Sequence, residues 1–141
     1  MAQTLQPTRA PLLPLVTAVL LLWHLALGAD YLNDRFAFLA EAPQISAQLV
    51  LPQIWAVVGW GLAVWLGLAA ALFMIWRDDA AVLLLFAATV SAALAVAGDV
   101  LAGGAGGILG LPRLVALALL VAIPLLGWLY ARARHASGHL N

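Results

Sequence analysis

The sequence predicts an all-helical integral membrane protein: a four-helix bundle with both termini in the cytoplasm, formed by one transmembrane domain over residues 1–141. Hydrophobic residues make up 66% of the chain and charged residues 9%, and the mean hydropathy is +1.08. Soluble domains carry about 25% charged residues, and a chain of 14.8 kDa is too small to enclose this much apolar surface away from water. Lipid is therefore the expected solvent, and four nearly charge-free segments approach or reach the length needed to cross it.

The first two predicted spans are residues 11–32 and 53–76. A transmembrane helix needs about 20 mostly apolar residues, because each residue adds 1.5 Å across a hydrocarbon core of about 30 Å. The second apolar window is longer than one span, and we expect Pro52 to mark the start of its helix, since proline fits the first turn. The connection over residues 33–51 is the longest in the chain, and we expect short helical pieces there.

The last two predicted spans are residues 80–99 and 112–131. Asp78 and Asp79 precede the third span and are favourable residues at a helix N-terminus. The short link between the second and third spans predicts a tight antiparallel hairpin. A glycine-rich turn separates the third span from the fourth. Pro124 lies inside the fourth span and is expected to kink it, because proline cannot donate the helical hydrogen bond.

The distribution of arginines predicts the orientation. Cytoplasmic loops of membrane proteins are enriched in arginine and lysine, and we expect a multi-pass protein of the bacterial inner membrane. An alternative is a secretory signal cleaved near Ala29, but the apolar segment is long for a signal and we expect an uncleaved chain. The predicted inner side carries Arg9, Arg77, Arg132 and Arg134, and the outer side Arg35 and Arg113.

Small residues at a spacing of four predict where the second and third spans touch. Helices associate in lipid through close backbone approach, which small residues permit, and residues four apart share one helical face. We expect the two stripes to face each other, although abundant alanine would also produce such a pattern. The stripes are Gly59, Ala63, Gly67 and Ala71 in the second span, and Ala87, Ser91 and Ala95 in the third.

A polar cluster ends the first span, in the segment HLALGADYLNDRF from His24 to Phe36. If the span is centred near Leu20, Asp30 lies about 15 Å along the axis, at the edge of the hydrocarbon. A helix end in water accounts for this cluster without a binding site. We expect a structural ion-pair network on this outer rim, and the alternative is a site for a small ligand or cation. The candidate residues are Asp30, Tyr31, Asp34 and Arg35, joined by Asp99 and Arg113 from the third and fourth spans.

His24 is the candidate that lies deepest in the membrane, about 6 Å from its centre by the same arithmetic. A polar side chain at this depth is expected to face other helices and to hydrogen-bond to a backbone carbonyl, Ser91 or Thr89. A role in ligand binding or proton handling is the alternative. Haem ligation is not expected, because the predicted spans contain no second histidine to serve as an axial ligand.

Other kinds of site are not expected. The chain has no cysteine, which excludes thiol chemistry and disulfides. Its net charge is zero, and its arginines form no cluster suited to nucleic acid. His135 and His139 have a spacing that binds metal on a helix, but we expect a solvated tail. With no nucleophile elbow or phosphate-binding loop, we expect no enzyme activity, no cofactor and no resident metal.

The chain resembles a family of small bacterial four-helix inner-membrane proteins that are often labelled sugar transporters without an established activity. The resemblance covers residues 22–91 and implies the same four-helix fold. His24 stands where the family has asparagine, and RDD replaces an arginine-rich hairpin turn. The matching features are LWH at residues 22–24, Gly28, DY at residues 30–31, PQ at residues 43–44, Pro52, Trp55, LAVWLG at residues 62–67, Arg77, Ala80 and Ser91.

Three functional hypotheses follow. The first, which we favour, is a non-catalytic accessory or interaction subunit. It is embedded in the lipid bilayer, and its protein partners are other membrane proteins or a second copy of itself. The second is a carrier of a small polar solute that works as an oligomer and needs a polar cavity from the outer rim to His24. The third, an enzyme or redox protein using His24 and Asp30, ranks last.

Overall fold

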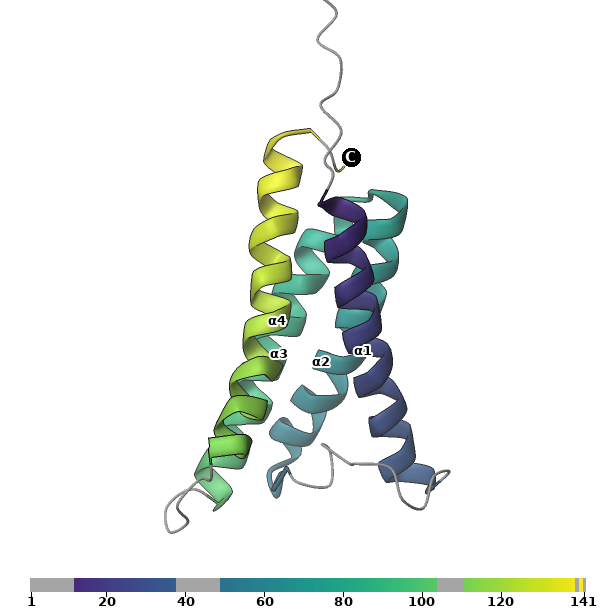
Figure 1. Ribbon diagram of the computed structural model, residues 1–141. Coiled ribbons are helices and arrows are strands. Elements are labelled where there is room, and N and C mark those ends of the chain that lie inside the picture. The colour runs from purple at the N-terminus through teal and green to yellow at the C-terminus, as the bar shows by residue number, and fades with distance from the viewer. Residues whose placement is uncertain (1–11, 38–48, 104–110, 139, 141) are drawn as a thin grey trace, which may run out of the picture.

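The computed structural model describes residues 12–37, 49–103, 111–138 and 140, in which the regular structure consists of helices (Figure 1). All four are long and apolar enough to cross a membrane. The protein is thus a four-helix membrane bundle, as predicted. The helices are α1 (Leu13–Phe36), α2 (Ile54–Trp76), α3 (Ala80–Gly103) and α4 (Leu111–Ala136).

Three of the helices extend beyond the predicted spans. α1 ends at Phe36 rather than at residue 32, α3 at Gly103 rather than 99, and α4 at Ala136 rather than 131. The sequence criterion locates the point where a chain leaves hydrocarbon, whereas a helix continues as long as its backbone hydrogen bonds continue. The expected helical pieces over residues 38–48 and the glycine-rich turn over residues 104–110 lie outside the described residues.

The connection between α2 and α3 is a tight turn, as its length predicts. Arg77 closes α2 in the left-handed conformation with φ 60°, and its N–H donates to carbonyls of the last turn. The Asp78 carboxylate then accepts a hydrogen bond of 2.8 Å from the backbone N–H of Ala80, the first residue of α3. One residue thus ends α2 and the next supplies an acceptor for an N–H that has no partner inside α3.

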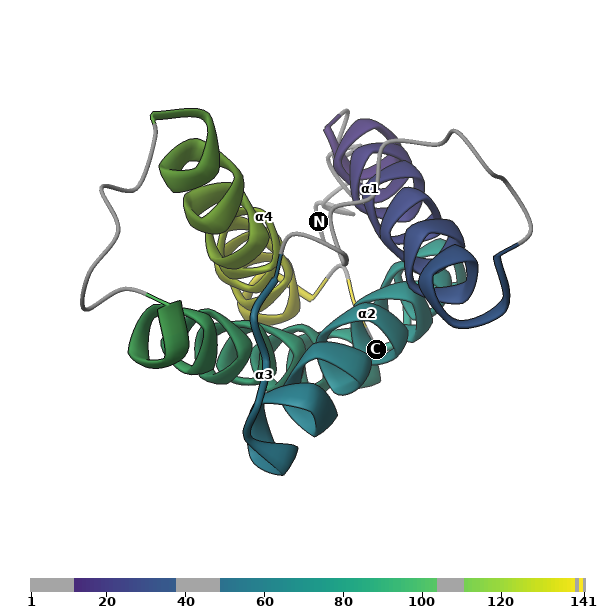
Figure 2. The same cartoon turned by 90° about the horizontal axis from the view of Figure 1, so that it is seen from below.

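The helices form an open bundle rather than a closed one. The α2–α3 contact is the most extensive, α1 packs on α2, α4 packs on α3, and α1 touches α4 only slightly. Figure 1 shows α1 and α4 diverging toward the end where α1 finishes and α4 begins, which we call the rim end; the opposite end is the tail end. Figure 2, seen from the rim end, shows α1 and α4 on one side of the α2–α3 pair.

Two apolar clusters fill the interior. The tail-end cluster includes Leu20, Met74 and Leu85, and Leu140 from beyond α4 belongs to it. The rim-end cluster combines Leu27, Trp60, Val64, Ala95, Leu117 and Leu120 from all four helices. Leu49 and Leu51, which precede α2, pack against this rim-end cluster. Figure 2 shows the segment that leads into α2 crossing this end of the bundle.

Close approach of α2 and α3 depends on residues without bulk. A Cβ added at Gly59 would lie 3.0 Å from the backbone oxygen of Ser91 and 3.4 Å from the nitrogen of Ala95. A Cβ added at Gly98 would overlap the side chain of Ala56. The two helices therefore meet with almost no side-chain layer between them, which is how helices associate in lipid.

Candidate functional site

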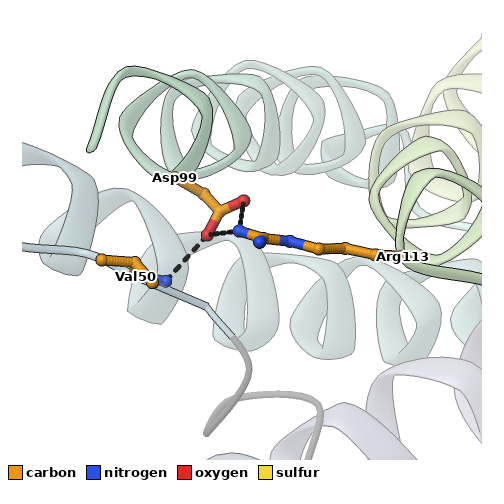
Figure 3. A network of polar contacts seen from close by, with 3 residues as sticks. All are labelled: Val50, Asp99 and Arg113. Carbon is orange, nitrogen blue, oxygen red and sulfur yellow. Dashed lines mark hydrogen bonds and ion pairs between the residues drawn. The ribbon is translucent and has the colours of Figure 1, made fainter. Parts of the chain in front are cut away.

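The best-defined polar site lies at the rim end and is centred on Asp99 (Figure 3). One nitrogen of the Arg113 guanidinium donates hydrogen bonds to both carboxylate oxygens of Asp99, at 2.8 and 2.7 Å. The backbone N–H of Val50 donates a third, at 2.7 Å. The Asp99 side chain is fully buried, and the Arg113 side chain is 31% exposed. Three chain segments, distant in the sequence, therefore meet at one carboxylate.

The positions of Asp99 and of its two partners, Arg113 and Val50, follow from the elements that carry them. Asp99 lies in the last turns of α3, and Arg113 lies in the first turn of α4. Val50 belongs to the short described segment that precedes α2 (Figure 3). A carboxylate removed from water loses several kcal/mol of hydration, and charge-assisted hydrogen bonds of this length are the interactions that compensate for such a loss. The chemistry of the arrangement is therefore that of an anchor between α3, α4 and this segment.

The other predicted rim residues are placed differently. The described ion pair joins Asp99 to Arg113, two of the five ionisable residues of the predicted network. Asp34 and Arg35 are exposed on the last turn of α1. Arg35 lies over the Tyr31 ring, with its guanidinium carbon 5.5 Å from the ring centroid, and Tyr31 makes an edge contact with Trp65 of α2. Asp30 is partly buried and has an interaction of its own.

His24 faces the interior of the bundle at the α1–α2 contact. Its side chain is 1% exposed, and Nδ1 lies 2.8 Å from the backbone oxygen of Leu20, one turn earlier in α1. The opposite edge of the ring lies against Gly67, where an added Cβ would overlap the ring. Of the partners considered from the sequence, the structure places a backbone carbonyl beside His24, while the Thr89 hydroxyl donates to Leu85 in its own helix.

The small-residue stripe of α2 has two partners rather than one. All four of its residues are buried, but Gly59 meets Ser91 and Ala95 of α3 whereas Gly67 meets His24 of α1. The expectation that the whole stripe faces α3 is therefore wrong at Gly67. Successive residues at a spacing of four drift around a helix of 3.6 residues per turn, so a long stripe turns from one neighbour toward the other. On the α3 side, Ser91 and Ala95 are buried and Ala87 is partly buried.

Two of the cavities among the described residues lie at the tail end. One, of about 340 Å³, lies between α1 and the end of α2 and is lined by Thr17, Met74 and Arg77 among others. The second, of about 270 Å³, lies between α3 and α4 and includes Asp79, Trp128 and His135. Neither is lined by His24 or Asp99. His139, the predicted companion of His135, lies outside the described residues.

Sequence reasoning missed two components of these sites. The first is the Val50 N–H, a backbone donor in an irregular segment, which no residue type reveals. The second is the cavity at Arg77, because Thr17 and Arg77 are far apart in the sequence and meet only through the α1–α2 contact. No family model, curated protein or solved structure matches the chain.

Proposed function

We propose that the protein is a non-catalytic accessory or interaction subunit of the bacterial inner membrane, with both termini in the cytoplasm, that associates through α1 and α4 with another membrane protein or a second copy of itself. The observation that carries this proposal is the unequal burial of the helices. In an 18-residue apolar window of each helix, 44% of residues are buried inside the bundle in α2 and 33% in α3, against 28% in both α1 and α4. The outer two helices thus each pack mainly on one neighbour.

The use of the interior polar groups supports the same proposal. The Asp99 carboxylate is occupied by Arg113 and Val50, and His24 is bonded to Leu20 and packed on Gly67. These groups hold segments of the chain together. Because these polar groups stabilise the fold of the subunit itself, the surface left for other molecules consists mainly of apolar helix faces. Within a membrane, such faces associate through close van der Waals packing.

The solute-carrier hypothesis has weaker support. It needs a polar path from the rim to His24, and the residues that pack in that region are those of the apolar rim-end cluster, including Leu27, Val64 and Leu120. The two cavities described above lie at the opposite end and do not reach His24. A carrier would have to open the segment around Val50 and separate this cluster during each cycle.

Native mass spectrometry of the protein extracted from membranes in mild detergent tests the proposal. A homo-oligomer or a complex with a second membrane protein is the expected result. Photo-crosslinking then tests which helices form the contact surface. A crosslinker at Leu22 of α1 or Leu126 of α4 should capture the partner more efficiently than one at Leu83 of α3. The three side chains are similarly exposed, at 67%, 65% and 69% respectively, so exposure alone would give equal capture. A strictly monomeric protein with no crosslinked product would contradict the proposal.

A further inference from the structure

The groove between α1 and α2 at the tail end combines an apolar wall with one cation. Its walls are Leu13, Ala18 and Leu21 from α1 with Met74 and Ile75 from α2, and Arg77 lines its end. Pro14 and Ala18 are exposed, as is Ile75, so the groove opens on the outer surface of the bundle, where acyl chains lie. Its volume of about 340 Å³ falls within the range of about 300–1,000 Å³ that small-molecule sites occupy.

Arg77 is available to an external anion. Its side chain is exposed, and among the described residues it forms no ion pair. The neighbouring acids are directed elsewhere: Asp78 accepts a hydrogen bond from Ala80, and Asp79 lines the cavity on the α3–α4 side. The charge that faces the groove is therefore positive.

The groups that line the groove are of the kinds that a phospholipid contacts. Arg77 directly follows the last residue of α2 and lines the end of the groove. Thr17 lies one turn inside the start of α1 and lines the groove, and its hydroxyl has no hydrogen-bond partner among the described residues. Leu21 lies one further turn inside, about 6 Å deeper. The groove thus combines one cation at its end with one hydroxyl set in an apolar wall.

We propose that this groove binds an anionic phospholipid, with the phosphate on Arg77 and one acyl chain along Ala18 and Leu21. Arginine pairs with phosphate through charge-assisted hydrogen bonds, and basic pockets between transmembrane helices on the cytoplasmic side bind anionic headgroups. The apolar wall selects a lipid over free phosphate, because free phosphate has no group to place against Leu21 and Met74. This inference concerns lipid recognition at the α1–α2 groove, and its test measures lipid binding rather than the oligomeric state.

Native mass spectrometry of the delipidated protein with added phosphatidylglycerol, phosphatidylcholine or inorganic phosphate tests the inference. Phosphatidylglycerol should bind more tightly than phosphatidylcholine, and phosphate should not bind. R77Q should weaken phosphatidylglycerol binding about fivefold, since one basic residue near the surface contributes about 1 kcal/mol to anionic lipid binding. R77K should largely restore it, and A18F, which fills the groove, should weaken binding of both lipids.

R132Q is the matched control, because it removes the same charge at the same end, and Arg132 lies over the Trp128 ring rather than in the groove. It should leave phosphatidylglycerol binding within about twofold of wild type. Arg77 is exposed, and substitutions at exposed positions change the stability of a protein little, so R77Q is expected to fold. Equal phosphatidylglycerol binding by R77Q, R132Q and wild type would overturn the inference, and so would a lack of preference for phosphatidylglycerol over phosphatidylcholine.

Discussion

Substitution of Gly67 by alanine probes the contact between α1 and α2 most sharply. In the middle of a helix, alanine is favoured over glycine by about 1 kcal/mol, so a G67A variant with free space would be more stable than wild type. The space is not free, because the new Cβ would overlap the ring of His24. That ring is 1% exposed and is held by its hydrogen bond to Leu20, so it cannot swing into an open region.

The magnitude follows from these opposing effects. Overpacking of a well-packed interior costs about 1–3 kcal/mol, and loss of the His24–Leu20 hydrogen bond would add about 1 kcal/mol. After subtraction of the helix-propensity gain, G67A should lower the free energy of unfolding by about 1–3 kcal/mol. G28A is the matched control, because a Cβ at Gly28 has its nearest neighbour at 3.8 Å; it should be neutral or stabilising by up to about 1 kcal/mol.

Unfolding of the protein in mild detergent by added SDS, followed by circular dichroism, measures both variants. The double variant H24A/G67A removes the overlap and should be more stable than the sum of its single changes predicts, with a coupling of about 0.5–3 kcal/mol. If G67A and G28A have the same stability, or if the double-mutant cycle is additive, the assigned contact between His24 and Gly67 is incorrect.

The remaining predictions use the same unfolding assay. D99N should cost about 1–3 kcal/mol, because it breaks a buried ion pair whose Arg113 partner keeps some contact with solvent, whereas D34N at an exposed position should change stability by about 0.5 kcal/mol or less. A D99N variant as stable as D34N would refute the anchor role of Asp99. D78A should lower the free energy of unfolding by about 1 kcal/mol through loss of the hydrogen bond from Ala80. An equal decrease in D79A would show that negative charge near the start of α3, rather than this hydrogen bond, stabilises the helix.

The fold was predictable because lipid imposes a simple rule on sequence. A spanning segment must be about 20 residues long and apolar, and its backbone must satisfy its own hydrogen bonds, which restricts it to a helix in a chain of this pattern. The short link at Arg77 and Asp78 then forces α2 and α3 to be neighbours. The helix ends were less predictable, because polar residues such as Asp30 and Asp34 lie inside α1 and do not mark its end.

The candidate sites were predictable only where geometry follows from topology. Asp99 and Arg113 meet because one ends a span and the other begins the next on the same side. The buried position of His24 follows from the cost of a polar group in lipid, but its contact with Gly67 depends on the rotation of α1 against α2, which no periodic pattern specifies. The Val50 donor and the groove at Arg77 depend on irregular backbone and on packing, and neither has a signature in residue types.

Labelling of single cysteines from one side of the membrane tests the central claim most directly: that the rim end and the tail end lie on opposite faces and that both termini are cytoplasmic. The chain has no cysteine, so R35C and S137C can be labelled without a background. In intact cells treated with an impermeant maleimide, R35C should be labelled, and S137C should react only after the membrane is permeabilised. Equal labelling of both positions in intact cells would contradict the four-span arrangement, and the reverse pattern would contradict its orientation.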